Sequence, residues 1–264
     1  MGIAHYPSIV LDKLVLYYDA ANSKSYSGSG VIINNLSENS NYNARIRGSR
    51  VTFSASQKAF EYTGTSDSSD SGIYIEGLNY VTGSADAFSN MTVECWCKSN
   101  SAPRDSDGDQ RIILSFDRSA VFRFAIGADA SSIRTQARGK PSLQWMNNTS
   151  VIDNYADTYS GDLRDDQWHQ VGVTFTRTAV KYYVDGVNVD THTGSWSPLS
   201  NHSENETPRY GYIGNGSEAT SAGGGIAPGD LFFGFISNLK YYYKTLSDAE
   251  MKQNFEALKG RFGI

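Results

Sequence analysis

The composition and charge of this 264-residue chain exclude several classes of protein before any motif is considered. Its 25 Gly, 17 Tyr and 12 Phe suit short strands joined by tight turns, so we expect an all-β protein with little helix. A formal net charge of −5 lacks the basic surface that a nucleic-acid binder needs, and no apolar stretch is long enough to span a membrane. Neither nucleic acid nor a membrane is therefore an expected partner.

The predicted strands begin after an N-terminal arm, residues 1–13, which ends where the first strand starts. In the first half of the chain we predict strands near 14–19, 31–36, 44–47, 51–55, 58–62, 73–76, 91–99, 111–116 and 121–127. In the second half we predict one or two strands over 131–146, a loop over 150–165, strands at 168–176, 180–185, 187–192 and 209–214, a Gly-rich loop at 215–229, and a final strand. No linker interrupts this series, so residues 14–264 are predicted to form a single β-sandwich domain.

The segment DDQWHQVGVTF at 165–175 has the alternation of a half-buried strand. Val171, Val173 and Phe175 are expected to point to one face and the residues between them to the other. The following segment, VKYYVDGVNVDT, turns at Asp185-Gly186, a dipeptide suited to the mirror-image turn of a two-residue hairpin.

The segment FFGFISNLKYYYKTLSDAE at 232–250 predicts a strand followed by a helix. The apolar residues expected on one face of that strand are Phe233, Phe235, Leu239 and Tyr241. Ser247 as N-cap and Glu250 three residues later form a capping box, so we predict a helix over 247–259. The residues at helical spacing that we expect to pack on the sandwich or on a neighbouring subunit are Met251, Phe255 and Leu258.

The two cysteines, Cys95 and Cys97, lie in one predicted strand and point the same way as Val93. Same-face neighbours on an extended strand are roughly 6.6 Å apart at Cα, which is at the limit of disulfide geometry. We therefore expect buried free thiols, which fit folding in a reducing cytoplasm.

The order and spacing of seven segments resemble the laminin-G-like, concanavalin A-like jelly-roll sandwich, and in particular the version found in virion proteins of tailed bacteriophages. The segments are IVLDKLVLYYDAAN, FEYTGTSDSSDSGIYI, MTVECWCK, DDQWHQVGVTF, VKYYVDGVNVDT, YGYIGNG and the closing strand with its helix. The resemblance covers nearly the whole chain. It implies a two-sheet fold and makes the Trp168-His169 pair part of the framework.

The resemblance also implies what an enzyme of this fold would need, and the chain lacks it. Glucan-cleaving relatives carry acidic residues at alternate positions of one strand, because retaining hydrolysis needs two carboxylates about 5–5.5 Å apart. Glu204 and Glu206 come nearest to this spacing, but they stand in the polar run SNHSENETP, which is predicted to be a loop. We therefore expect no catalytic residues.

No metal or cofactor is expected either, although laminin-G-like modules often bind calcium at one rim. Asp105, Asp107 and Asp109 offer carboxylates at alternate positions. In their loop the glycine stands too early for an EF-hand calcium loop, and the bidentate Glu that ends such a loop is missing. We therefore interpret the segment as a solvated turn. Gly214-x-Gly216-x-x-Ala219 resembles a dinucleotide loop, but no predicted helix follows it to receive a phosphate.

Sugar binding is the function that the composition leaves open, because exposed aromatic rings stack on sugar faces while amides and carboxylates bind hydroxyls. The candidate contacts are Trp145, Asn147 and Trp196, together with the loop 193–208. Our leading hypothesis is a non-enzymatic structural or accessory protein of a phage virion, such as a capsid decoration, tail or baseplate component. It would fold in the host cytoplasm and assemble with other virion proteins, as an oligomer. The alternative is a lectin-like module that recognises a cell-surface glycan.

Overall fold

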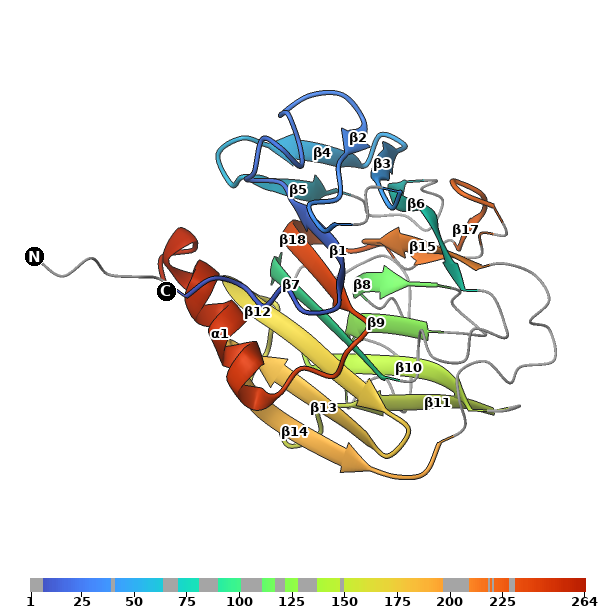
Figure 1. The fold of residues 1–264 in the computed structure, drawn as a ribbon, viewed down its shortest axis with the longest axis vertical. Helices are drawn as coiled ribbons and strands as arrows, with labels where there is room; N and C mark the ends of the chain where they lie inside the picture. The colour runs from blue at the N-terminus through green and yellow to red at the C-terminus, as the bar shows by residue number, and fades with distance from the viewer. Residues whose placement is uncertain are drawn as a thin grey trace, which may run out of the picture.

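The protein is a sandwich of two antiparallel β-sheets with one short C-terminal helix, which confirms the predicted fold class (Figure 1). The computed structural model describes residues 7–38, 41–63, 71–80, 90–100, 111–116, 122–127, 137–147, 150–196, 209–217, 219, 221–227 and 231–264. No helix in these ranges is long and apolar enough to cross a membrane.

The first sheet, sheet A, has the strand order β14-β13-β12-β7-β18-β5-β4, and β1 also pairs with β18. Its strands are β1 (Leu14–Asp19), β4 (Val51–Ser54), β5 (Ala59–Tyr62), β7 (Asn90–Asn100), β12 (Asp165–Thr176), β13 (Ala179–Val184), β14 (Val187–Thr193) and β18 (Gly234–Tyr242). The last strand of the chain therefore lies beside β1, β5 and β7, which come from its first half.

The second sheet, sheet B, has the order β11-β10-β9-β8-β15-β6-β3-β2. Its strands are β2 (Ile32–Ile33), β3 (Ala44–Arg47), β6 (Gly72–Tyr80), β8 (Arg111–Ser115), β9 (Phe122–Ile126), β10 (Pro141–Asn147), β11 (Ser150–Tyr155) and β15 (Arg209–Ile213). β16 (Gly216–Ser217) and β17 (Ile226–Ala227) form a separate two-stranded ribbon inside the predicted Gly-rich loop.

The core lies between the sheets, and the predicted alternation places side chains in it correctly. Val171, Val173 and Phe175 of β12 are fully buried, as are Val93 and Cys95 of β7. Both cysteines are free and point into this core, as predicted. At the Asp185-Gly186 turn, φ is 51° and 76°, so both residues adopt the left-handed conformation that the predicted mirror-image hairpin requires.

The predicted apolar face of β18 is correct for Leu239 and Tyr241 but wrong for Phe233 and Phe235, which are half-buried outside the core, because the strand contains a β-bulge. Its register against β7 shifts between Ile236 and Asn238, so one extra residue interrupts the alternation. Ile236, Leu239 and Tyr241 point into the core, whereas Phe235 lies outside it and contacts Trp168. The prediction assumed strict alternation of side chains along 233–241, and such alternation cannot show where a bulge shifts the register.

The predicted loop over 150–165 is also wrong in its first part, where β11 pairs with β10 along its length. β11 is an edge strand whose side chains are exposed or half-buried, so its sequence SVIDNY shows little apolar alternation. The predicted strand at 31–36 shortens to β2, which has two residues.

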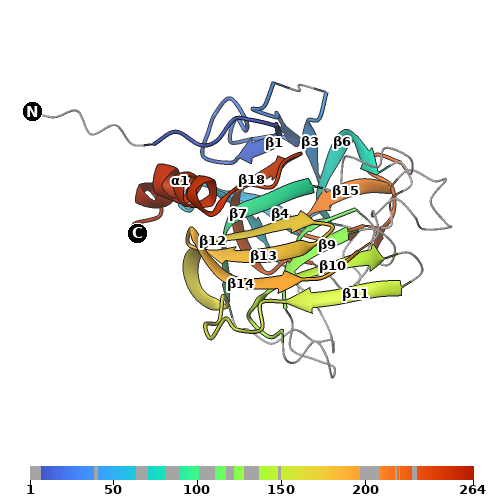
Figure 2. The same ribbon diagram turned by 60° about the horizontal axis from the view of Figure 1, so that its bottom comes forward.

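Helix α1 (Asp248–Leu258), followed by the 3-10 turn η1 (Lys259–Arg261), covers the outer face of sheet A (Figure 2). Its start agrees with the prediction, because Ser247 and Glu250 form both hydrogen bonds of a capping box. Met251 and Phe255 are buried as expected, whereas Leu258 is half-buried. The methyl group of Met251 lies over Gly172 of β12, where a Cβ atom would be only 2.5 Å away.

Candidate glycan-binding site

The candidate site lies where the edge strands of the two sheets meet, β11 of sheet B and β14 of sheet A (Figures 1 and 2). The hydroxyl of Tyr182 on β13 crosses between the sheets and donates to Asn154 Oδ1 at 2.8 Å. Thr158, just after β11, donates through its side chain to the backbone oxygen of Val189 at 2.8 Å. We call this region the edge seam and define it as Asn154, Tyr155, Asp157, Asp190, His192 and Trp196.

Asp190 is the most constrained charge in the edge seam. Its exposed fraction is 9%, and its carboxylate accepts hydrogen bonds from the backbone N–H groups of Thr158 at 3.1 Å and Thr191 at 2.8 Å. Burial alone raises the pKa of this carboxyl, but the backbone hydrogen bonds from Thr158 and Thr191 and the nearby His192 outweigh burial and lower the pKa below its usual range. Asp190 is therefore ionised at neutral pH.

His192 connects the two strands through one ring nitrogen. Its Nε2 lies 3.0 Å from the backbone oxygen of Tyr155 and 3.2 Å from Asp190 Oδ2. The backbone oxygen of Tyr155 can only accept a hydrogen bond, and so can Asp190 when it is ionised. Nε2 of His192 therefore carries the proton and donates the hydrogen bond. This contact joins β14 to the end of β11.

The same residues form a group that could hold a metal ion, because Asp157, Asp190 and His192 each offer one ligand atom and these atoms lie within 4.8 Å of one another. Two carboxylates and one imidazole suit a divalent cation. To act as a ligand, however, His192 Nε2 would have to give up its proton and its hydrogen bond to Tyr155. Hydrogen bonding between the sheets accounts for this arrangement without a metal, and the absence of a metal stays a prediction.

This cluster could not be predicted from the sequence, for a physical reason. Asp157 and Asp190 are 33 positions apart and meet only because β11 and β14 are the edge strands of different sheets. The one local signal is Asp190-x-His192, two residues that share a face of one strand. The acidic residues singled out instead, Asp105, Asp107, Asp109, Glu204 and Glu206, lie outside the described residues.

Two of the three predicted sugar contacts come together at the far end of the seam. The ring of Trp196 lies 5.3 Å from that of Trp145 and 6.1 Å from that of Phe175, measured between centroids. Trp196 is half-buried and keeps part of its surface, whereas Trp145 is only 1% exposed. Trp145 therefore packs against the buried side of Trp196 and has no ring face exposed to solvent.

The burial of Trp145 follows from its strand position. Leu143 and Trp145 point into the core, whereas Gln144 between them points to the opposite face of the strand. Asn147, the third predicted contact, ends β10 opposite Ser150, and its side chain lies outside the described residues, as does the loop 197–208.

The outer face of sheet B carries a polar row that could be mistaken for a catalytic face. Neighbouring strands place the following residues in register across it: Asp153, Gln144, Arg123, Ser115, Tyr212, Tyr74 and Arg45. Arg123 donates to Gln144, which in turn donates to Asp153. At the other end, Arg45 lies 2.5 Å from Glu76.

The carboxylates on the described part of this face are too far apart for glycoside hydrolysis. Asp153 on β11 and Glu76 on β6 are separated by five strand spacings, about 24 Å. Hydrolysis with retention or inversion needs two carboxyl groups about 5 to 9.5 Å apart. The described residues of this face therefore supply no catalytic pair.

The comparison with protein families agrees with this architecture. The family described as the concanavalin A-like lectin/glucanases superfamily matches residues 67–252, most of the chain. This chain belongs to that superfamily. No relative was found among curated protein sequences.

Solved structures with a similar fold include the binding domain of a toxin and one domain of an enzyme. The binding domain of botulinum neurotoxin DC, solved in complex with SialylT, superimposes with a TM-score of 0.61 at 14% identity over 94% of this chain. This chain spans only 52% of that toxin domain. Domain 4 of an extracellular arabinanase from Geobacillus stearothermophilus, solved with arabinotriose, gives a TM-score of 0.56 at 15% identity, over 93% of this chain and 99% of that domain.

Proposed function

We propose that this protein is a non-enzymatic carbohydrate-binding module that holds its glycan at the edge seam. The observation that carries the proposal is Trp196, a half-buried ring fixed by Trp145 and Phe175 at the same sandwich edge as Asp157 and His192. A ring held in place loses little freedom on binding, and sugar faces stack on such rings while carboxylates accept bonds from hydroxyls.

The absence of catalysis is part of the proposal. It is supported by the separation of Asp153 and Glu76 on the outer face of sheet B and by the ion pair that occupies Glu76. The domains of similar fold that were solved with a sugar, from a neurotoxin and an arabinanase, are consistent with a binding role.

A titration of the variant Trp196→Ala tests the site. Binding of neutral oligosaccharides, arabinan fragments among them, is measured by calorimetry for the unchanged protein and for the variant. We expect Trp196→Ala to weaken binding at least about tenfold, or about 1.4 kcal/mol. The matched control is Phe235→Ala, which removes another half-buried ring, on the outer face of sheet A. Equal losses in both variants would place the glycan elsewhere.

A narrower proposal places this module in a tailed-phage virion, as a capsid decoration, tail or baseplate component that forms an oligomer with other virion proteins. It rests on the resemblance of the segments IVLDKLVLYYDAAN and NFEALKGRFGI to virion proteins of tailed bacteriophages and on two buried free thiols, which suit folding in the host cytoplasm. Mass spectrometry of purified particles tests it directly. Capsid and tail genes beside the gene would favour it, whereas a sugar-utilisation cluster would favour a free lectin-like module.

A further inference from the structure

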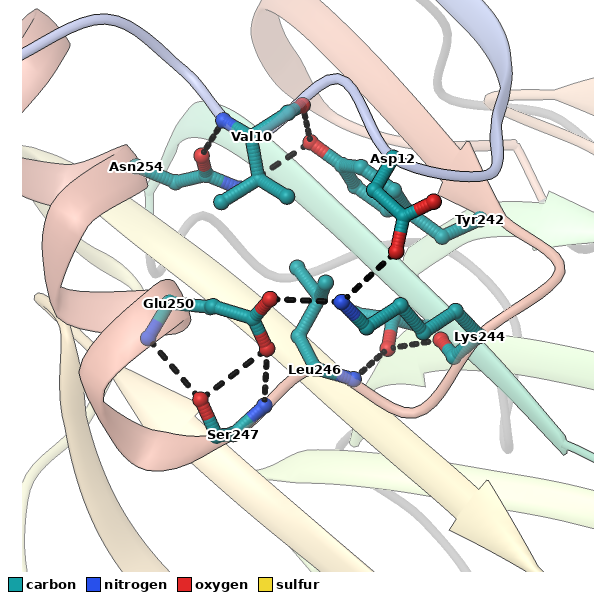
Figure 3. Close-up of polar contacts among 9 residues, drawn as sticks. Val10, Asp12, Tyr242, Lys244, Leu246, Ser247, Glu250 and Asn254 are labelled. Carbon is teal, nitrogen blue, oxygen red and sulfur yellow. Dashed lines mark hydrogen bonds and ion pairs between the residues drawn. The ribbon is translucent and has the colours of Figure 1, made fainter.

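Residues 8–13, which precede β1, form a strap that runs over helix α1 (Figure 3). The backbone N–H of Val10 donates to Asn254 Oδ1 at 2.7 Å, and the backbone oxygen of Val10 accepts from Tyr242 Oη at 3.1 Å. Gln253 of the helix donates to the backbone oxygen of Ser8 at 2.7 Å. The two ends of the chain are thus joined by polar contacts on the outer face of sheet A.

A chain of charges connects the strap to the first turn of the helix. Lys244 Nζ lies 3.0 Å from Asp12 of the strap and 2.6 Å from Glu250. Glu250 also accepts from the backbone of Ser247 as part of the capping box (Figure 3). Lys244 therefore links the strap to the start of α1, in addition to the direct contact of the strap with Asn254.

Beneath the helix lies an ion pair with no exposed surface, Glu94 and Lys240, whose charged atoms are 2.8 Å apart. Asn254 Nδ2 donates to Glu94 Oε1 at 3.0 Å, and Gln170 donates to Glu94 Oε2 at 2.8 Å. Asn254 thus binds the buried carboxylate with one end of its amide and the strap with the other. A buried charge depends on such partners, because an uncompensated one is strongly destabilising.

The strap and α1 share a small apolar cluster that is separate from the core of the sandwich. That cluster contains Val10, Tyr183, Tyr242, Leu246 and Met251. Of the described residues, those buried in the main core come from the two sheets and the segments joining them, and none comes from the strap or from α1. Only three of the eleven helix residues are buried. The apolar core between the sheets therefore contains no described side chain of the strap or of α1.

A bend separates the strap from the sandwich. Lys13, the residue before β1, has a φ of 58°, which is left-handed and unfavourable for a residue with a side chain. Its backbone oxygen accepts from Tyr243 at 3.0 Å, which anchors the sandwich side of the bend.

We propose that the strap is a latch for helix α1. When the strap detaches at Lys13, Asn254 and Lys244 lose partners, and α1 leaves sheet A together with the residues after it while the sandwich stays folded. The surface this uncovers contains Trp96, on which Phe255 and Phe262 stack at centroid distances of 5.5 and 4.1 Å, and the pair Glu94 and Lys240. The device is a conformational switch between a covered and an open outer face of sheet A.

Hydrogen exchange of the full chain followed by mass spectrometry tests the latch. Under mild denaturant, the amides of 248–262 become exposed to exchange when α1 opens, and those of β7 and β12 when the sandwich opens. We expect the helix opening to be at least about tenfold more frequent than the opening of these strands. This measurement needs no variant. Exchange of the helix and of these core strands at one common rate would overturn the proposal, because the terminal segments would then open only with the whole protein.

Variants of the strap test its role directly. Val10→Pro removes the N–H that holds Asn254, and combined with Asp12→Ala it also removes the contact to Lys244. We expect this double variant to speed exchange in 248–262 at least about tenfold, with β7 and β12 unchanged. The control is Leu11→Ala, which alters a strap side chain that is 70% exposed. Unchanged protection of the helix in the double variant would show that the strap is not a latch.

Discussion

His169 shows how strongly position alone can set the charge of one residue. Its Nδ1 lies 2.8 Å from Asp185 and its Nε2 lies 3.3 Å from Asp165. Burial by itself lowers the pKa of His169, but hydrogen bonds and charge from Asp185 and Asp165 outweigh burial and raise the pKa to about 9. The sequence resemblance placed His169 only in the framework of the fold, because Asp185 reaches it through the hairpin.

The charge of His169 predicts a pH dependence of stability. Its folded pKa lies above the unfolded value of about 6.5, so its contribution is complete below pH 6.5 and is lost as the pH rises through 9. Asp185→Asn keeps the turn, since Asn tolerates a left-handed backbone, but removes the charge. We expect this variant to lose about 2 kcal/mol of unfolding free energy at pH 6.5 and much less at pH 9.5.

Urea unfolding of the protein and of Asp185→Asn between pH 6 and 9.5 measures this effect. The control is Asp166→Asn at the same end of β12, whose carboxylate is 62% exposed and 3.4 Å from Lys98. An exposed pair of this kind contributes little. Parallel profiles for the protein and Asp185→Asn would contradict the assignment.

Cys95 and Cys97 lead to a second prediction at this scale. Both thiols are buried, and burial together with Cys97 raises the pKa of Cys95 well above its usual value. A protonated, inaccessible thiol is a poor nucleophile. Alkylation of the native protein should therefore leave its mass unchanged, and alkylation after denaturation should modify both residues. Rapid labelling of the native protein would contradict this prediction.

At the scale of elements, helix α1 could be predicted almost to the residue because its start is encoded locally. The capping box uses Ser247 and Glu250, which are three residues apart. The burial of Asn254 could not be predicted in this way, because its partner Glu94 is 160 residues away. Local signals locate an element, whereas the contacts made by its buried polar side chains depend on the whole fold.

Phe255→Ala is expected to loosen the helix. Phe255 is 9% exposed, stacks on Trp96 and lies over Gly186. Its truncation should remove about 3 kcal/mol from the interaction of α1 with sheet A, through lost transfer energy and the cavity left behind. The measurements are the melting temperature and the amide exchange of 249–258. Lys252→Ala, an exposed change on the same helix, is the control. A variant that matches the control in both measurements would contradict the expected packing.

The strands also differ in how much of each could be predicted from its local sequence. β1 and β3 have the predicted bounds, because both are short runs between turn residues. β11 was missed because an edge strand with little burial has little apolar alternation, and the face of Phe235 was assigned wrongly because a bulge changes the register without changing composition. Both errors concern information that lies in the pairing of strands and not in any one strand.

At the scale of the whole molecule, the order of strand signals was enough to predict the sandwich, but the candidate site was predicted only in part. Trp196 was proposed as a contact because it stands in a polar loop, and it keeps part of its surface exposed, but its role in binding stays a prediction. Asp157, Asp190 and His192 were not proposed, since the edge seam exists only once the two sheets are stacked with β11 beside β14. Trp145 was misjudged as a surface ring although its own alternation with Gln144 placed it in the core.

Catalysis depends on the whole arrangement of acidic residues in the protein. Hydrolysis of a glycosidic bond couples protonation of the leaving oxygen to attack on the sugar carbon, and this needs two carboxyl groups at a fixed short separation. Among the described acids, Asp157 and Asp190 lie close together, but Asp190 is held ionised and hydrogen-bonded to the backbone, so it is poorly suited to act as an acid. Asp12 and Glu250 both pair with Lys244, and Asp165 and Asp185 both pair with His169. A cationic partner favours the ionised carboxylate, so these pairs are also poorly suited to donate a proton.

A soluble-sugar release assay over β-glucans, arabinan, alginate and bacterial polysaccharides should therefore stay at background, with or without added calcium. Release that grows with protein concentration and disappears in Asp190→Asn would contradict the prediction and make the edge seam an active site. Release that persists in Asp190→Asn would contradict it as well, and would point to acids outside the described residues. Glycan binding that is unchanged by a chelator and lost in Trp196→Ala, with no release, is the outcome expected of a binding module.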